Sequence, residues 1–205
     1  MINYLKFMKS AEAITSKTTI SRPILKGVYH SDEGNLYVTD AHVGIRAKGV
    51  NAPKNTIIDP KTGKEIDGNY PNLENIFQKS EDSLEDSQAF SFSLDELLDI
   101  TKAMQYGNGL KPTERRQATF IIEDDVMRLH NKDNKNIDFR YKLPTQSEHK
   151  IAFNSEYLLN VLELMQEQNA TNVTLHLAHS TKPIYIRCNL VDIDAVIMPL
   201  RLDRL

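Results

Sequence analysis

The hydrophobic and polar positions of the chain follow two periods. In three stretches apolar residues recur every three to four positions, which is typical of helices that bury one face: residues 5–14, 94–104 and 158–165. Shorter apolar runs, several of them alternating at every second position, predict strands. The strands are expected at residues 24–30, 36–39, 45–47, 55–58, 89–92, 118–122, 126–130, 137–143, 150–153, 173–177, 184–188 and 196–202.

Local signals mark the ends of the helices. Arg22-Pro23 ends the first helix, because proline disfavours helical backbone in the residue before it. Ser93 with Glu96 is a capping-box pattern, and Asn154 is a favourable N-cap. Residues 70–77 predict a short helical turn. Strands dominate and each helix has one apolar stripe, so the helices should lie across sheets in an α+β fold.

The elements form three segments of similar plan, each with a helix and a run of strands. After the first segment, residues 78–88 are acidic and contain serines, which favours a linker. We predict a linker at residues 81–88, between a first domain of residues 1–80 and a second of residues 89–205.

The last predicted strand, residues 196–202, is apolar but contains Pro199 and Arg201. Proline has no N–H to donate to a neighbouring strand, so this strand should lie at the edge of a sheet or end there. Its apolar side chains beside one cation could receive an extended peptide. The alternative is a chain end that folds onto its own core.

Composition narrows the class of protein. The chain has 205 residues, of which 40% are hydrophobic and 26% charged, as in soluble globular proteins. No stretch has the roughly 20 apolar residues of a membrane span, and the N-terminus lacks the order of a signal peptide. The single cysteine, Cys188, excludes an intrachain disulfide, fits a reducing cytoplasm and should be a buried filler. The net charge of −3 argues against binding nucleic acid by bulk charge.

No catalytic or metal-binding constellation stands out, so we expect no enzyme, metal or cofactor. His42 follows Asp40 by two residues, but a turn histidine that packs locally is the simpler interpretation. Glu123-Asp124-Asp125 lacks calcium-loop spacing and should be a solvated hairpin turn. One cationic loop either contacts phosphate or is simply solvated: Lys111, Arg115 and Arg116.

Several stretches together resemble the bacterial DNA polymerase III β sliding clamps. The final stretch, Val196–Leu202, is similar to the family's C-terminal signature, and Phe153–Leu162 resembles the last helix of its third domain. Arg22–Val28, followed by Val38–His42, resembles the opening hairpin of its middle domain. Tyr70–Ile76 resembles the segment that leads out of that domain. The stretches occur in the family's order and cover most of the chain.

The resemblance implies a sliding-clamp fold and a role in DNA replication as a processivity factor. In that family the chains form a six-domain ring around duplex DNA. The ring tethers polymerases and the clamp loader through a short peptide of each partner, bound in an apolar cleft between the middle and last domains. Two domains per chain would require three chains in such a ring, a symmetric homotrimer.

The resemblance also implies site residues. The peptide cleft would be formed by Leu25, Thr39, Ala41, His42, Pro71, Asn75, Ile76, Asn154, Tyr157, Val196, Met198, Pro199, Leu200 and Arg201. The cations placed to contact DNA would be Lys6, Lys9, Arg22, Lys102, Lys111, Arg115 and Arg116.

The chain departs from the family in several places. The family's first domain has no counterpart in these 205 residues, and the first domain here should lack its second helix and the strands that accompany it. Asn75 stands where the family usually has a basic residue, and Ala41 replaces a glycine. Acidic residues on the predicted helices argue against a uniformly basic inner face. Two functions stay open: a ring-forming processivity factor, or a non-ring peptide-binding regulator or decoy of the replication machinery.

Overall fold

The structure is a computed structural model of the chain, and it describes residues 2–15, 22–106, 118–131, 138–188 and 190–201. The helices are α1 (Tyr4–Thr15), α2 (Glu74–Asp82), α3 (Leu94–Tyr106) and α5 (Ser155–Glu167), with a short 3₁₀ helix, η1 (Pro23–Lys26). The strands are β1 (Val28–His30), β2 (Leu36–Thr39), β3 (Val43–Ala47), β4 (Thr56–Ile58), β5 (Gln88–Ser93), β6 (Ala118–Glu123), β7 (Val126–Asn131), β8 (Asp138–Lys142), β9 (Ile151–Asn154), β10 (Asn172–Leu177), β11 (Ile184–Cys188) and β12 (Ile193–Ile197).

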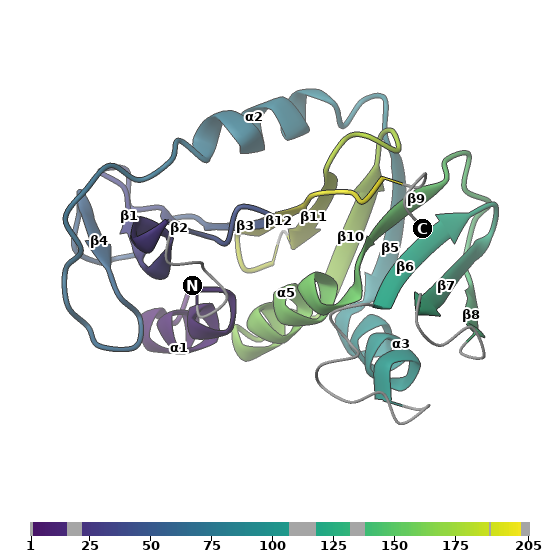
Figure 1. Cartoon of the computed structure of the whole chain (residues 1–205), viewed down its shortest axis with the longest axis horizontal. Coiled ribbons are helices and arrows are strands. Elements are labelled where there is room, and N and C mark those ends of the chain that lie inside the picture. Colours follow the sequence, from purple (N-terminus) through teal and green to yellow (C-terminus); the bar gives the residue numbers. More distant parts are fainter. Residues whose placement is uncertain (1, 16–21, 107–117, 132–137, 189, 202–205) are drawn as a thin grey trace.

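These strands form two antiparallel sheets (Figure 1). The eight-stranded sheet has the order β4-β1-β2-β3-β12-β11-β10-β5, and the four-stranded sheet has the order β8-β7-β6-β9. Near the centre of the larger sheet β3 pairs with β12, placing Val43 opposite Ile197 and Ala47 opposite Ile193. Strands from the first and last parts of the chain therefore share one sheet. The α+β class predicted from the sequence is confirmed.

One face of the large sheet carries the main core. Successive residues of a strand point to opposite faces, and on this face Val38, Ile45, Ile186 and Ala195 are buried with the apolar stripes of three helices. α5 lies between α1 and α3 and also packs on β12 and β6 (Figure 1). The core therefore continues from the large sheet into the four-stranded one.

The opposite face of the large sheet is covered in part by α2 (Figure 1). Phe77 is completely buried at its centre, with its ring 6.3 Å from that of Tyr37 and 6.5 Å from that of Tyr185. Gly44 lies beneath the helix, where a Cβ would approach Val196 Cγ2 to 3.1 Å. A small residue on β3 thus lets the outer layer pack closely on the sheet.

A buried arginine attaches α2 to the sheet. Arg46 on β3 is 2% exposed, and its guanidinium lies 4.6 Å from the centre of the Phe77 ring. It donates hydrogen bonds to Glu74 at 3.0 Å, Glu81 at 2.6 Å and Asp194 at 2.6 Å. Glu74 and Glu81 are seven residues apart, so they lie on one face of the helix. We call these four charged residues the Arg46 cluster.

Several local predictions are confirmed. The Asn154 side chain accepts a hydrogen bond from the Glu156 N–H at 2.9 Å and so caps α5. Cys188 is buried, and burial raises the pKa of its thiol. Asp124 and Asp125 form the turn between β6 and β7, with Asp124 at φ 54°.

Other predictions are wrong. Residues 24–26, predicted as the start of a strand, belong to η1, because the fixed φ of Pro23 favours a helical first turn. The last strand is β12, Ile193–Ile197, and it lies inside the sheet rather than at its edge. Pro199 comes two residues after the strand ends, so it interrupts no pairing. The helix expected at 70–77 runs over Glu74–Asp82, so the first two residues of the predicted 81–88 linker are helical. The division into two domains there stays a prediction.

Candidate functional site

The loop between β2 and β3 is shaped by its own polar side chains. The Asp40 carboxylate accepts hydrogen bonds from the N–H groups of His42 and Val43, both at 2.9 Å. The Thr39 hydroxyl donates to the Val43 carbonyl at 2.6 Å and accepts from the Ala41 N–H at 2.9 Å. Ala41 has φ 79°, a left-handed conformation that favours glycine. The loop is therefore held tightly, and His42 lies exposed at its end.

This loop meets α5 and the end of the chain. The His42 ring stacks on the Tyr157 ring with the centroids 6.0 Å apart and an interplanar angle of 13°. The Met198 N–H donates to the His42 carbonyl at 2.8 Å, and the Leu200 N–H donates to the Ala152 carbonyl at 2.7 Å. The segment after β12 thus lies between the loop and β9. We call the surface formed by His42, Tyr157 and residues 198–201 the hairpin–tail site.

The hairpin–tail site exposes apolar side chains. Met198 is 40% exposed and Leu200 is 37% exposed, although their backbone is hydrogen-bonded on the sheet side. Arg201 is exposed and forms no ion pair with the residues that the structure describes. Burial, the negative charges of Asp40 and Glu156, and a hydrogen bond with Asp40 raise the pKa of Tyr157 to about 12. The Tyr157 ring is therefore a neutral platform at any physiological pH.

Two predicted peptide-site residues, Asn75 and Ile76, belong to α2, which covers part of the outer face of the large sheet. Ile76 is 38% exposed, and it borders a small apolar cavity of about 170 Å³ that Leu84, Pro183 and Tyr185 also line. Its neighbour Phe77 belongs to the buried cluster that contains Val196. Asn75 is exposed, and its N–H is bonded to the Asn72 side chain at 3.2 Å. The position of α2 on the sheet therefore decides where Ile76 lies relative to β12.

The remaining predicted peptide-site residues are less directly involved. Leu25 is buried on η1 and offers little surface. Pro71 is exposed, and Tyr70 before it donates a hydrogen bond to the Gly27 carbonyl at 3.2 Å, which holds this segment near η1. Val196 is buried under α2, and Thr39 is used within its loop. Thr39 and Val196 therefore support the hairpin–tail site from within, whereas Leu25 and Pro71 lie at η1 and in the segment before α2.

The predicted DNA contacts that fall within the described residues do not form a basic surface. α1, α3 and α5 together carry three lysines and seven carboxylates. Lys6 pairs with Glu167 at 3.6 Å, and Lys102 pairs with Glu163 at 3.8 Å. Arg22 is exposed before η1, and Lys9 is exposed on α1. The other three predicted cations lie outside the described residues: Lys111, Arg115 and Arg116.

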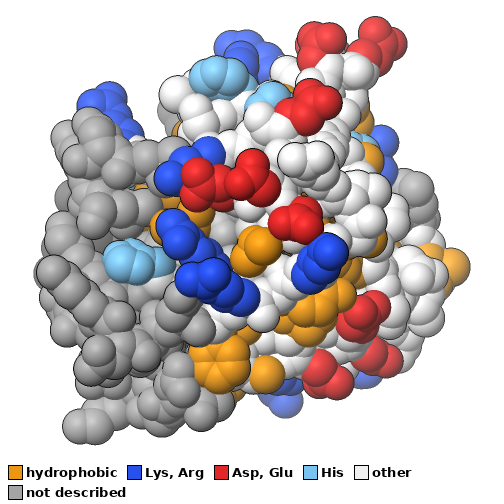
Figure 2. All heavy atoms as spheres, turned by 90° about the vertical axis from the view of Figure 1, so that its right-hand side faces the viewer, with side chains coloured by type: hydrophobic (Ala, Val, Ile, Leu, Met, Phe, Trp, Pro, Cys, Tyr) orange, Lys and Arg blue, Asp and Glu red, His pale blue; other side chains and the backbone are white. Residues whose placement is uncertain are grey.

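Among the described residues, no group of three His, Cys, Asp or Glu side chains is placed to hold a metal ion. None of the described helices is both long and apolar enough to cross a membrane. The surface on the side of β7 and β8 mixes acidic and basic side chains with apolar patches (Figure 2).

Sequence reasoning missed the Arg46 cluster. Glu81 falls in a stretch interpreted as an acidic linker. Burial alone would raise the pKa of its carboxyl, but the hydrogen bond and charge of Arg46 and the hydrogen bond from Tyr185 outweigh burial and lower that pKa. One signal was present. An arginine inside the apolar run of β3 requires acidic partners, and the spacing of Glu74, Phe77 and Glu81 fits one helix face.

No protein-family model and no curated protein matches the sequence. Solved structures do match. The DNA polymerase III beta chain from Streptococcus pneumoniae TIGR4 has a TM-score of 0.66 and 16% identity, covering 98% of this chain and 64% of its own. The sliding clamp from Bacillus subtilis has a TM-score of 0.69 and 17% identity, covering 96% and 62%. The DnaN sliding clamp from Bartonella birtlesii, bound to griselimycin, has a TM-score of 0.67 and 19% identity, covering 97% and 64%.

At these identities the likeness establishes the fold. The matches extend over nearly the whole chain and include both sheets, since at least 96% of the chain is covered in each. The chain has the fold of the bacterial DNA polymerase III β sliding clamps and spans about 64% of the length of the Streptococcus pneumoniae chain.

Proposed function

We propose that this protein is a clamp-like tethering factor that binds the short clamp-binding peptides of replication proteins at the hairpin–tail site. One observation carries the proposal. Met198 and Leu200 are exposed while their backbone is bonded to the His42 loop and to β9. Exposed apolar side chains on a fixed backbone can bind a partner without first paying a large ordering cost. Methionine adapts to varied ligand shapes.

The partners that we propose are a DNA polymerase and a clamp loader, each through a short extended segment. Such a segment would place its apolar side chains on Met198, Leu200 and Ile76. Its own flanking groups would lie beside the His42–Tyr157 stack, and an acidic or C-terminal carboxylate could pair with Arg201.

The test is a titration with a fluorescein-labelled peptide that copies the clamp-binding segment of a bacterial replicative polymerase, followed by fluorescence anisotropy. We expect Met198→Ala with Leu200→Ala to weaken binding by on the order of 1–4 kcal/mol, as loss of apolar anchors does. Leu5→Ala is the matched control, because Leu5 is 77% exposed on α1, away from the site. Equal affinities for the wild type and the double variant would refute the site.

A ring around DNA is the second candidate function, and the likeness in fold favours it. Two observations weigh against it. The three helices that would face DNA carry net negative charge. The outer edge of β4 is also not free to pair with a second chain. It is already bonded to its own loop, because the Ile66 N–H donates to the Ile57 carbonyl at 2.8 Å. Sedimentation velocity at micromolar concentration decides: a stable trimer supports the ring, and a monomer supports a non-ring regulator or decoy.

A further inference from the structure

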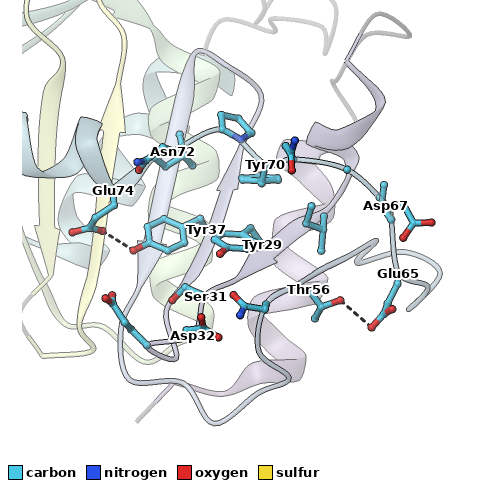
Figure 3. A pocket seen from close by; sticks show the side chains of 18 residues that line it. Tyr29, Ser31, Asp32, Tyr37, Thr56, Glu65, Asp67, Tyr70, Asn72 and Glu74 are labelled. Atoms are coloured by element: carbon cyan, nitrogen blue, oxygen red, sulfur yellow. Dashed lines mark hydrogen bonds between the residues drawn. The ribbon is translucent and has the colours of Figure 1, made fainter.

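A second surface feature lies on the outer face of the large sheet, beyond the N-terminal end of α2. It is a hollow of about 770 Å³ between β1, β2, β4 and residues 65–74, which cross above them (Figure 3). It is larger than the 170 Å³ cavity beside Ile76. Of the predicted site residues, it contains only Pro71.

The floor of this hollow is aromatic. The Tyr29 ring stacks on the Tyr37 ring at 6.1 Å and 28°, and on the Tyr70 ring at 5.6 Å and 19° (Figure 3). Two of the hydroxyls are fixed, because Tyr37 donates to Glu74 at 2.6 Å and Tyr70 donates to the Gly27 carbonyl at 3.2 Å. The tyrosines therefore form a rigid floor before any ligand arrives. We call the hollow with this floor the tyrosine hollow.

The rim of the tyrosine hollow is acidic. Asp32, Glu33, Glu65, Asp67 and Glu74 line it, and none of its eighteen lining residues is Lys, Arg or His. Glu74 is bonded to Arg46, and Glu65 accepts from the Thr56 hydroxyl at 2.9 Å. The other three carboxylates are exposed and form no ion pair within the described part of the chain.

These features together define the ligand. An aromatic floor and an acidic rim complement a cation, and guanidinium groups stack well on tyrosine faces. The carboxylates are spread around the rim and do not converge on one point where a metal ion would bind. Several cations along a chain fit this distribution better than a single ion. Strand addition is not available at β4, since its outer edge is bonded to residues 65 and 66.

We propose that the tyrosine hollow binds an arginine- or lysine-bearing segment of a partner protein, through side chains rather than through strand pairing. One basic side chain would lie against the tyrosine floor, and its neighbours would pair with Asp32, Glu33 and Asp67. This inference does not depend on the hairpin–tail site. The two surfaces could bind two parts of one partner or two different partners.

The test uses the whole chain and a fluorescein-labelled peptide of alternating arginine and serine. Its counterpart with citrulline in place of arginine keeps the size and removes the charge. We expect the arginine peptide to bind in low salt and the citrulline peptide to bind at least about tenfold more weakly. Equal binding of the two peptides would overturn the proposal.

Two triple variants separate the hollow from bulk charge. Asp32→Asn with Glu33→Gln and Asp67→Asn should weaken the arginine peptide about tenfold. Asp86→Asn with Glu85→Gln and Asp99→Asn removes the same charge from exposed positions elsewhere and should change binding less than about twofold. Equal losses in both variants would mean nonspecific attraction and would overturn the proposal.

Tyr29→Leu, which removes one ring of the aromatic floor, should also weaken binding of the arginine peptide, by about threefold or more. Binding of the clamp-motif peptide at the hairpin–tail site should be unchanged in all these variants.

Discussion

The contacts of the Arg46 cluster predict how much stability is lost when α2 is no longer bonded to Arg46. In Arg46→Met an apolar side chain of similar length replaces the guanidinium. Glu74, Glu81 and Asp194 then lose hydrogen bonds of 3.0, 2.6 and 2.6 Å. Asp194 is affected most, because its side chain is only 5% exposed.

The magnitude follows from what remains around Asp194. Removing one partner of a buried ion pair costs about 3–5 kcal/mol, because the other charge is left buried. Lys48 Nζ at 3.1 Å and Arg187 Nε at 3.3 Å stay beside Asp194 and offset part of this loss. We therefore expect the free energy of unfolding to fall by about 3 kcal/mol, near the lower end of that range.

Urea unfolding followed by circular dichroism measures this loss. Lys6→Met is the matched control, since it breaks an exposed pair with Glu167 and should cost less than about 1 kcal/mol. Because α2 carries Ile76, Arg46→Met should also speed amide exchange in α2 and weaken the clamp-motif peptide. An Arg46→Met variant as stable as Lys6→Met would refute this view of the cluster.

Three further predictions follow from the site and the cluster. Ala41→Gly should stabilise the protein by about 1 kcal/mol in urea unfolding, because Ala41 is held at φ 79°; a loss of stability would contradict the strained loop. Acid should destabilise the wild type: burial raises the pKa of Asp194, but Arg46 and Lys48 outweigh it and leave the pKa below the ordinary value. This stabilisation is complete above the unfolded-state pKa of about 4 and is lost as the pH falls below it, through the lowered folded pKa. Arg46→Met should reduce this acid dependence, and an unchanged pH profile would contradict it. His42→Ala should weaken the clamp-motif peptide by about 1 kcal/mol, measured by anisotropy, since it removes one half of the aromatic stack; an unchanged affinity would mean that the stack does not contribute.

The sequence predicts the strands well where burial alternates strictly. In β10 and β11 every second residue is apolar and faces the main core, so period-two patterns were sufficient for Val173–Leu177 and Ile184–Cys188. The pattern fails where backbone chemistry decides. Pro23 starts a 3₁₀ turn in an apolar run, and β12 begins at Ile193, earlier than the apolar run suggested, because Asp194 is paired with Arg46 inside the sheet.

The hairpin–tail site could be predicted only through the resemblance. No local pattern places His42 on Tyr157, because they are far apart in the sequence and meet only in the folded chain, where β3 pairs with β12. The tyrosine hollow was not predicted from the sequence. Tyr29 and Tyr37 face each other because β1 pairs with β2, but Tyr70 joins them only because residues 65–74 cross above these strands.

The central claim is that partner peptides bind between the His42 loop and the end of the chain. Photo-crosslinking tests it most directly, with a clamp-motif peptide that carries benzophenone at one apolar position and mass spectrometry to locate the attached residue. The account predicts attachment to Met198, Leu200 or Ile76. Attachment to the tyrosine hollow, or to the exposed faces of α1, α3 and α5, would contradict it.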